Sequence, residues 1–190
     1  MKIGLYFGSF NPIHIGHLII ASYVLEYSDI EQVWFVVSPQ NPLKKSAGLL
    51  NEYHRLYLVQ IAIENNLKFR ISDIEFKLSR PSYTINTLTY LQEKYPQHQL
   101  AIILGSDSFK NIDKWKNSEL LLKNFSFYVY LRPGFEVKES YTTNIIVLKA
   151  PLLDISSTYI RNAIQNGKSI KYLIPENVLE EIERNRYYKK

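Results

Sequence analysis

The sequence contains no cysteine among its 190 residues. This absence excludes a disulfide framework, a thiol nucleophile and a thiolate metal site, and it fits a reducing compartment. No apolar run approaches the ~20 residues that span a bilayer. The N-terminus also lacks a secretory pattern, because the short apolar run at residues 3–7 is soon interrupted by glycine and proline. We therefore predict a cytoplasmic protein with no membrane partner.

Charge of one sign is also in small excess. The chain has 23 Lys and Arg against 18 Asp and Glu, a formal net charge of +5, and its one dense basic cluster is the end, residues 184–190. Scattered basic residues with a basic terminus are typical of a solvated tail, so we predict no nucleic-acid partner. A mild positive excess suits a site that binds several phosphates. The oligomeric state stays open, and a homo-oligomer is compatible with the sequence.

Segments with strand and helix patterns alternate along the whole chain. Apolar or alternating runs predict strands at residues 3–7, 32–37, 70–78, 100–104, 125–132 and 145–148. Helical spacing and capping residues predict helices at 18–27, 51–66, 83–95 and 157–165, short turns within 109–124, and a last helix from Pro175. This order favours an α/β fold with a Rossmann-like, doubly wound, mainly parallel sheet and helices on both faces. We expect one domain, 1–190, whose C-terminal helical part (about 155–190) packs on the rest.

Several predicted loops follow strand ends. They open at Gly8, Ser38, Leu78 and Gly105. In a doubly wound parallel sheet the carboxyl ends of the strands lie along one edge, where such folds bind their ligands. We therefore expect the active-site cleft along this edge.

The segment 8–17 has the sequence GSFNPIHIGH and joins the first predicted strand to the first predicted helix. Backbone N–H groups at a helix start attract anions. His14 and His17 can face one ligand and suit oxygens that gain negative charge during phosphoryl or nucleotidyl transfer, while Gly16 leaves room for a flat group. A histidine that only caps the helix remains an alternative. Zinc is disfavoured, because only two further histidines exist and no cysteine, and we predict no protein-built metal site.

A second motif, ISSTYIR at residues 155–161, places serine and threonine before an arginine at the start of a late helix. Together with GSFNPIHIGH it resembles the nucleotidyltransferase superfamily that is related to class I aminoacyl-tRNA synthetases. Within that superfamily the chain most resembles the bacterial nicotinate mononucleotide adenylyltransferases, almost from end to end. The supporting segments are RPSYT at 80–84, GSDS at 105–108 followed by Trp115, and LRPG at 131–134.

The resemblance implies a reaction in which ATP, as co-substrate, and nicotinate mononucleotide give deamido-NAD and pyrophosphate, with Mg²⁺ held mainly by the ATP phosphates. It implies catalytic roles for His14, His17 and Arg161. The ATP-binding residues it implies are Gly8, Ser9, Phe10, Gly16, Gly105, Asp107, Ser156, Ser157, Thr158 and Arg161. The residues it implies for the second substrate are Lys44, Tyr83, Thr84, Asp107, Trp115 and Arg132. Thr84 would receive the nicotinate carboxylate, and Trp115 would stack on the pyridine ring.

Several alternatives remain at this stage. Trp115 is also compatible with an ordinary core position, and Thr84, Ser156 and Ser157 with simple helix capping. Lys45 competes with Lys44 for the phosphate contact. A sister enzyme that uses phosphopantetheine or makes a cytidylyl transfer shares the first motif, and a non-catalytic nucleotide-binding or nucleic-acid-binding module is the alternative from another class.

Overall fold

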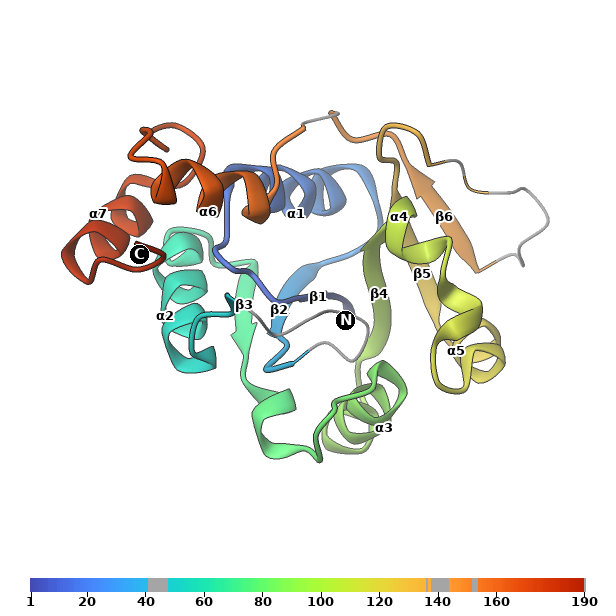
Figure 1. Cartoon of the computed structure of the whole chain (residues 1–190). Coiled ribbons are helices and arrows are strands. Elements are labelled where there is room, and N and C mark those ends of the chain that lie inside the picture. The colour runs from blue at the N-terminus through green and yellow to red at the C-terminus, as the bar shows by residue number, and fades with distance from the viewer. Residues whose placement is uncertain (41–47, 136, 138–143, 152–153, 190) are drawn as a thin grey trace.

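The computed structural model describes residues 1–40, 48–135, 137, 144–151 and 154–189 (Figure 1). Within this part of the chain six strands form one sheet in the order β3-β2-β1-β4-β5-β6, and every pairing is parallel. The strands are β1 (Lys2–Gly8), β2 (Gln32–Val37), β3 (Phe69–Ser72), β4 (Gln99–Gly105), β5 (Ser126–Tyr130) and β6 (Ile145–Leu148). The predicted Rossmann-like fold class is thereby confirmed.

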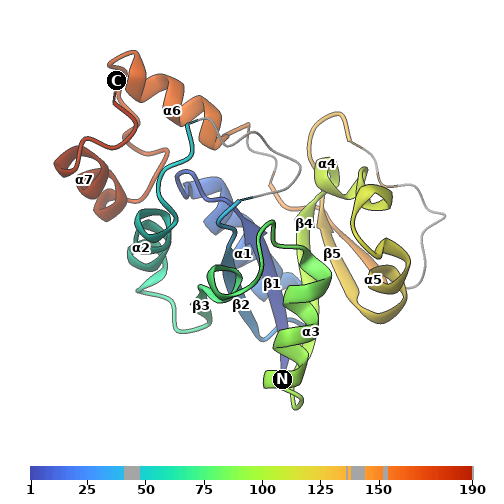
Figure 2. The ribbon, with the colours of Figure 1, turned by 60° about the horizontal axis from the view of Figure 1, so that its bottom comes forward.

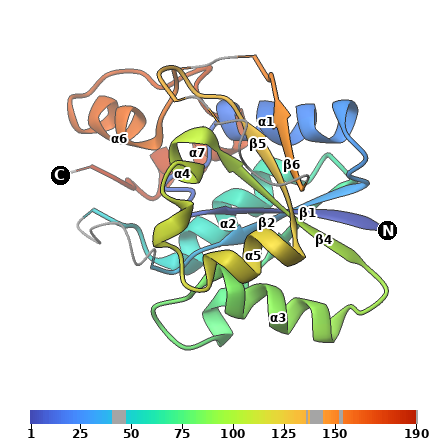
Figure 3. The same cartoon turned by 90° about the vertical axis from the view of Figure 1, so that its right-hand side faces the viewer.

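Helices cover both faces of the sheet (Figure 3). They are α1 (Ile15–Tyr27), α2 (Glu52–Ile63), α3 (Thr84–Lys94), α4 (Ser106–Phe109), α5 (Ser118–Asn124), α6 (Ser157–Gln165) and α7 (Glu176–Arg184), with 3-10 turns η1 (Ile74–Lys77) and η2 (Ile112–Lys114). Two of the predicted helices begin at a capping side chain. The side chain of Asn51 accepts a hydrogen bond at the start of α2, and that of Ser156 accepts one at the start of α6.

Alternate residues of each central strand enter two separate cores. Tyr6 of β1 and Phe35 of β2 pack with buried residues of α1, α2, α6 and α7. Leu5 and Trp34, their neighbours along the strands, pack on the opposite face with buried residues of α3 and α5. Successive strand side chains point to opposite faces, so each apolar run of the central strands supplies both cores at once.

The prediction of a strand over residues 70–78 is wrong beyond Ser72. β3 ends at Ser72, which pairs with Val36, and the chain then turns into η1. The reason lies in the neighbouring strand: among the described residues β3 pairs only with β2, and β2 itself ends at Val37, so a longer β3 would have no strand beside it there. Consequently no strand ends at Leu78. The chain passes through η1 instead, and Ser82 and Tyr83 then line a cavity at the carboxyl edge of the sheet.

The two central strands, β1 and β4, mark the point where the strand order reverses. The chain leaves β1 for β2 on one side, and β4 continues to β5 on the other. Ligands of open α/β sheets bind in the crevice outside the carboxyl ends of the strands at such a point. Here those ends are Gly8 and Gly105.

The C-terminal helices lie beside α1 and α2, as Figures 1 and 2 show. Asn177 at the start of α7 donates from Nδ2 to the carbonyl of Ile61 in α2, at 2.6 Å. Tyr187 and Tyr188, beyond α7, pack against the same core as α1 and α2. In the part of the chain that the structure describes, no helix has the length and apolar character needed to cross a membrane.

A fully buried arginine in α2 holds the loops that follow β1 and β2. Nη1 of Arg55 donates to the carbonyls of Ser9 and Ser38, and its Nη2 donates to that of Pro39 at 3.0 Å. Its Nε donates to the carbonyl of Leu50 at 2.8 Å. One planar group with several fixed donors thus satisfies four backbone acceptors from three segments.

Replacing Arg55 by Met should lower the free energy of unfolding by about 3 kcal/mol, because several buried carbonyls would lose their donor. Urea unfolding followed by circular dichroism measures the change. Arg70→Met, at an exposed position of β3, is the matched control and should change stability little. Equal stability of the two variants would contradict the role given to the Arg55 guanidinium.

Candidate active site

Two adjoining cavities open at the carboxyl ends of β1 and β4. The first, of about 280 Å³, contains His14 and His17 in its lining, and we call it the histidine cavity. The second, of about 770 Å³, contains Trp115, and we call it the tryptophan cavity. Their shared wall is formed by Phe7, Gly8, Ser9, Leu104, Asp107 and Ser108. Molecules bound in the two cavities would therefore meet at the ends of the two central strands.

The turn after β1 is shaped by Phe10. This residue has φ 43°, in the left-handed region, and only 2% of it is exposed. Its ring lies over Gly8, where an added Cβ would come within 2.7 Å of Phe10. The ring also packs edge-on against His17, with 5.1 Å between centroids. Gly8 is therefore required for space rather than for an unusual backbone angle. The Phe10 ring packs against the His17 ring and so restricts its orientation.

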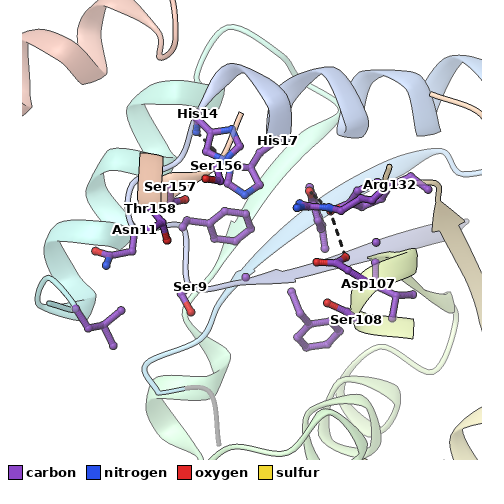
Figure 4. Close-up of a pocket in the computed structure, with 18 of the residues that line it drawn as sticks. Ser9, Asn11, His14, His17, Asp107, Ser108, Arg132, Ser156, Ser157 and Thr158 are labelled. Carbon is purple, nitrogen blue, oxygen red and sulfur yellow. Dashed lines mark hydrogen bonds and ion pairs between the residues drawn. The ribbon is translucent and has the colours of Figure 1, made fainter. Parts of the chain in front are cut away.

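The two histidines lie against each other at the start of α1 (Figure 4), with 3.7 Å between ring centroids. The backbone N–H of His14 donates to Nδ1 of His17 at 3.2 Å. This bond requires an unprotonated Nδ1, and so it places the ring proton of a neutral His17 on Nε2. The backbone of the motif thus selects the tautomer with an N–H donor at the far end of the ring.

His14 is buried, with 3% exposed. Its burial, assisted by the positive charge of Arg132, lowers its pKa to about 4, so the ring is neutral at pH 7. A Cβ on residue 16 would lie 3.0 Å from Nδ1 of His14. The flat group for which Gly16 leaves room is therefore the His14 ring, and Gly16 does not line either cavity.

The second motif contacts the first one directly. The hydroxyl of Ser157 donates to the carbonyl of Pro12 at 2.8 Å, and Nη1 of Arg161 donates to the carbonyl of Asn11 at 2.8 Å. Nη2 of Arg161 reaches the hydroxyl of Thr158 at 3.2 Å. The start of α6 is thus joined to residues 9–14, which we call the histidine loop. The N-termini of two helices, α1 and α6, contribute to one cavity.

An ion pair forms the other side of the histidine cavity. Nε of Arg132 lies 3.4 Å from a carboxylate oxygen of Asp107, and Nη2 of Arg132 donates to the hydroxyl of Tyr130 at 3.2 Å (Figure 4). The Tyr130 hydroxyl lies 3.4 Å from that of Tyr6. An added Cβ on Gly105 would meet Asp107 at 2.4 Å, so this glycine provides the space in which the pair sits.

The start of α3 and the segment around η2 line the tryptophan cavity. Tyr83, Thr84 and Trp115 line it, as do Lys114 and Lys116. Tyr83 is the N-cap of α3 but makes no side-chain capping bond, and no acidic residue lies in the first turn. The amides and positive dipole end of α3 remain suited to an anionic group.

The structure brings the predicted residues together in two groups. Those predicted for ATP line the histidine cavity, apart from Gly16, and Asp107 lines both cavities as a residue expected to touch both substrates would. Of the residues predicted for the second substrate, Arg132 lines the histidine cavity instead, and Lys44 lies outside the described residues.

Sequence reasoning missed several polar residues that line the cavities, among them Tyr6, Asn11, Tyr130 and Glu75. Asn11 lay inside the recognised motif, and its side chain bonds to Gly48 and Leu50 across the loop. The two tyrosines lay in predicted buried strands, where a hydroxyl near a strand's carboxyl end is the only signal. Glu75 lay in the predicted strand 70–78, whose alternating pattern is typical of a strand exposed on one side.

Comparison with known proteins gives a consistent result. Residues 5–163 match the family model described as cytidylyltransferase-like. A protein of Cytophaga hutchinsonii named "Probable nicotinate-nucleotide adenylyltransferase" is 52% identical over 99% of this chain and 98% of its own length. A protein of the same name from Flavobacterium johnsoniae is 50% identical, with both chains covered completely.

Solved structures agree on the fold. The nicotinic acid mononucleotide adenylyltransferase of Plasmodium falciparum, solved in complex with NaAD, superposes with a TM-score of 0.83 and 24% identity, over 98% of this chain and 97% of that one.

The depressed pKa of His14 predicts a pH-dependent stability. Between about pH 6.5 and 4 the unfolded chain binds a proton on His14 that the folded chain excludes. The free energy of unfolding should therefore fall as the pH drops through this window, by on the order of 3 kcal/mol from this residue.

Urea titrations at pH 4, 5, 6 and 7 measure this slope. His14→Gln should flatten it, because the residue that loses its proton on folding is then absent. Parallel pH dependence in the wild type and His14→Gln would show that the His14 ring titrates normally in the folded protein.

Proposed function

The chain belongs to the nicotinate-nucleotide adenylyltransferase family, within the cytidylyltransferase-like proteins, and from this premise we propose that it transfers AMP from ATP to nicotinate mononucleotide. The products are deamido-NAD and pyrophosphate, and the reaction is a step of NAD biosynthesis. We place it in the cytoplasm, with small molecules as its substrates and no part for a nucleic acid or a membrane.

The observation that supports this proposal most directly is the shared wall of the two cavities. A nucleotidyl transfer between two nucleotides needs both phosphates at one place, with the remainder of each molecule directed away from it. Gly8, Ser9 and Asp107 belong to both linings. ATP in the histidine cavity and the acceptor in the tryptophan cavity would bring their phosphates together there.

The chemical step we propose is an in-line displacement. A phosphate oxygen of nicotinate mononucleotide attacks the α-phosphorus of ATP, the bond from that phosphorus to the bridging oxygen breaks, and pyrophosphate leaves with the electron pair. The nucleophile is already an anion, so the reaction needs no strong general base. Positioning and stabilisation of the developing charge then account for most of the rate.

On the ATP side, His17 would donate from Nε2 to an oxygen of the reacting phosphate, with the tautomer selected by the His14 backbone. The N-termini of α1 and α6 would face the triphosphate. Arg161 and Arg132 are the two arginines that line the histidine cavity, and their guanidinium groups suit phosphate oxygens.

On the acceptor side, Trp115 offers an aromatic face for the pyridine ring, and Thr84 with the first amides of α3 offers donors for its carboxylate. Lys114 and Lys116 add positive charge at the rim. An acceptor that combines a flat ring with an anion fits this lining better than a long, flexible thiol such as phosphopantetheine.

Magnesium fits this set of residues as an ion bound by substrate. Among the described residues no group of three or more His, Asp or Glu is arranged to hold a metal ion. Asp107 is the carboxylate in the lining of the histidine cavity, and it is already paired with Arg132. Mg²⁺ prefers phosphate oxygens and water as ligands, and when bound it would neutralise part of the triphosphate charge. In this lining, Asp107 is the residue whose carboxylate oxygens would suit the ion.

Pyrophosphate release with different acceptors tests the function. The protein, ATP and magnesium are incubated with nicotinate mononucleotide, nicotinamide mononucleotide or phosphopantetheine, and the product is identified by mass. We expect the highest kcat/KM with nicotinate mononucleotide. Turnover restricted to phosphopantetheine would assign the chain to the sister reaction, and no turnover together with salt-sensitive RNA or DNA binding would indicate a binding module.

Replacing His17 by Ala should lower kcat by about 10²-fold or more, because an N–H donor aimed at charge that develops in the transition state is lost. The KM for ATP should change less. His98→Ala, in the loop before β4 at the opposite end of that strand, is the control and should keep the wild-type kcat. Wild-type turnover by a folded His17→Ala protein would remove His17 from the chemical step.

A further inference from the structure

Glu75 is a buried carboxylate in the wall of the tryptophan cavity. It lies in η1, with 2% of its surface exposed, and it is the one carboxylate among the buried polar residues of the described chain. Glu75 has no part in the proposed displacement at the α-phosphorus. A charged group in such a position needs a physical reason, because its burial is costly.

No basic side chain pairs with this carboxylate in the described residues, and its partners are hydroxyl groups. Ser82 donates to Oε2 at 2.8 Å, and Thr87 donates to Oε1 at 3.1 Å. Burial raises the pKa of Glu75, while hydrogen bonds from Ser82, Ser38 and Thr87 oppose that rise. One oxygen therefore contacts a residue just before α3, and the other a residue within its first turn.

The two principal partners enclose the start of α3. Ser82 lies immediately before Tyr83 and Thr84, and Thr87 is placed one turn into the helix. The N–H groups of Asn86 and Thr87 already bond to the carbonyl of Tyr83. Glu75 thus fixes both sides of the turn that presents Thr84 and the first free amides of α3 to the tryptophan cavity.

We propose that Glu75 is a positioning residue for the acceptor nucleotide: its carboxylate bridges Ser82 and Thr87 and thereby sets the start of α3 against the acceptor's anionic group. This inference rests on the proposed function. Glu75 does not touch the reacting atoms, and its effect passes through the backbone and side chain of residues 82–84.

The test compares the KM for nicotinate mononucleotide with the KM for ATP in four proteins. Glu75→Gln keeps the shape of the side chain but leaves one acceptor oxygen, and Thr87→Val removes one hydroxyl with little change of shape. We expect each to raise the KM for nicotinate mononucleotide about 10-fold, with the KM for ATP within about twofold. Asp73→Asn, an exposed carboxylate two residues earlier that pairs with Lys77, is the control and should leave both values unchanged.

A stronger variant, Glu75→Ala, should raise the same KM further, and Glu75→Asp should not rescue it because the shorter side chain reaches only one partner. If Glu75→Ala fails to fold, the Gln and Val variants still decide the matter. Equal changes in both KM values, or lost thermal stability with unchanged KM values, would overturn the positioning role. A wild-type protein that makes no deamido-NAD would instead refute the proposed function, and the inference with it.

Discussion

The buried guanidinium of Arg55 is the contact on which the geometry of both cavities depends. Ser9 and Ser38 follow the ends of β1 and β2, and both of their carbonyls accept from Nη1 of Arg55; without this arginine the buried carbonyl of Ser38 would lose that donor. A buried carbonyl without a donor costs more free energy than an ordinary hydrogen bond gains. Loop arrangements that move these carbonyls away from Arg55 are therefore unfavourable, and the arginine acts mainly by excluding them. Because Arg55 holds the Ser9 carbonyl, the next residue, Phe10, is kept where its ring packs against His17.

Several features were predictable because local physics decides them. The inner strands β1, β2, β4 and β5 are largely apolar runs bounded by glycine, proline and polar turns, and burial on both faces requires that composition. The helix caps at Asn51 and Ser156 follow from side chains that accept backbone N–H bonds. The two motifs were visible because phosphate binding at a helix start requires particular residue types at fixed spacing.

Other features depend on contacts between distant segments, and no local pattern reveals them. The end of β3 is decided by the length of its neighbour β2, not by its own alternation. Glu75 lies in the segment 70–78, whose alternation predicts a strand exposed on one side, and the hydroxyl partners that accompany its burial lie 7 and 12 residues further along. Gly16 was expected to leave room for a flat group, and the ring of His14 from the same loop lies in that space. In each case the deciding partner comes from the tertiary structure.

The bonds between the two motifs have a consequence for how the protein is made. Asn11 and Arg161 are 150 residues apart, and Pro12 and Ser157 are 145 apart. A ribosome releases the sheet strands, the histidine loop and the tryptophan cavity before it releases α6. Until then the carbonyls of Asn11 and Pro12 have no donor from α6, and one of the two helix N-termini that contribute to the histidine cavity does not exist. The growing chain therefore completes the lining of the tryptophan cavity first and that of the histidine cavity last, so that a chain interrupted before α6 is left with only part of the histidine cavity.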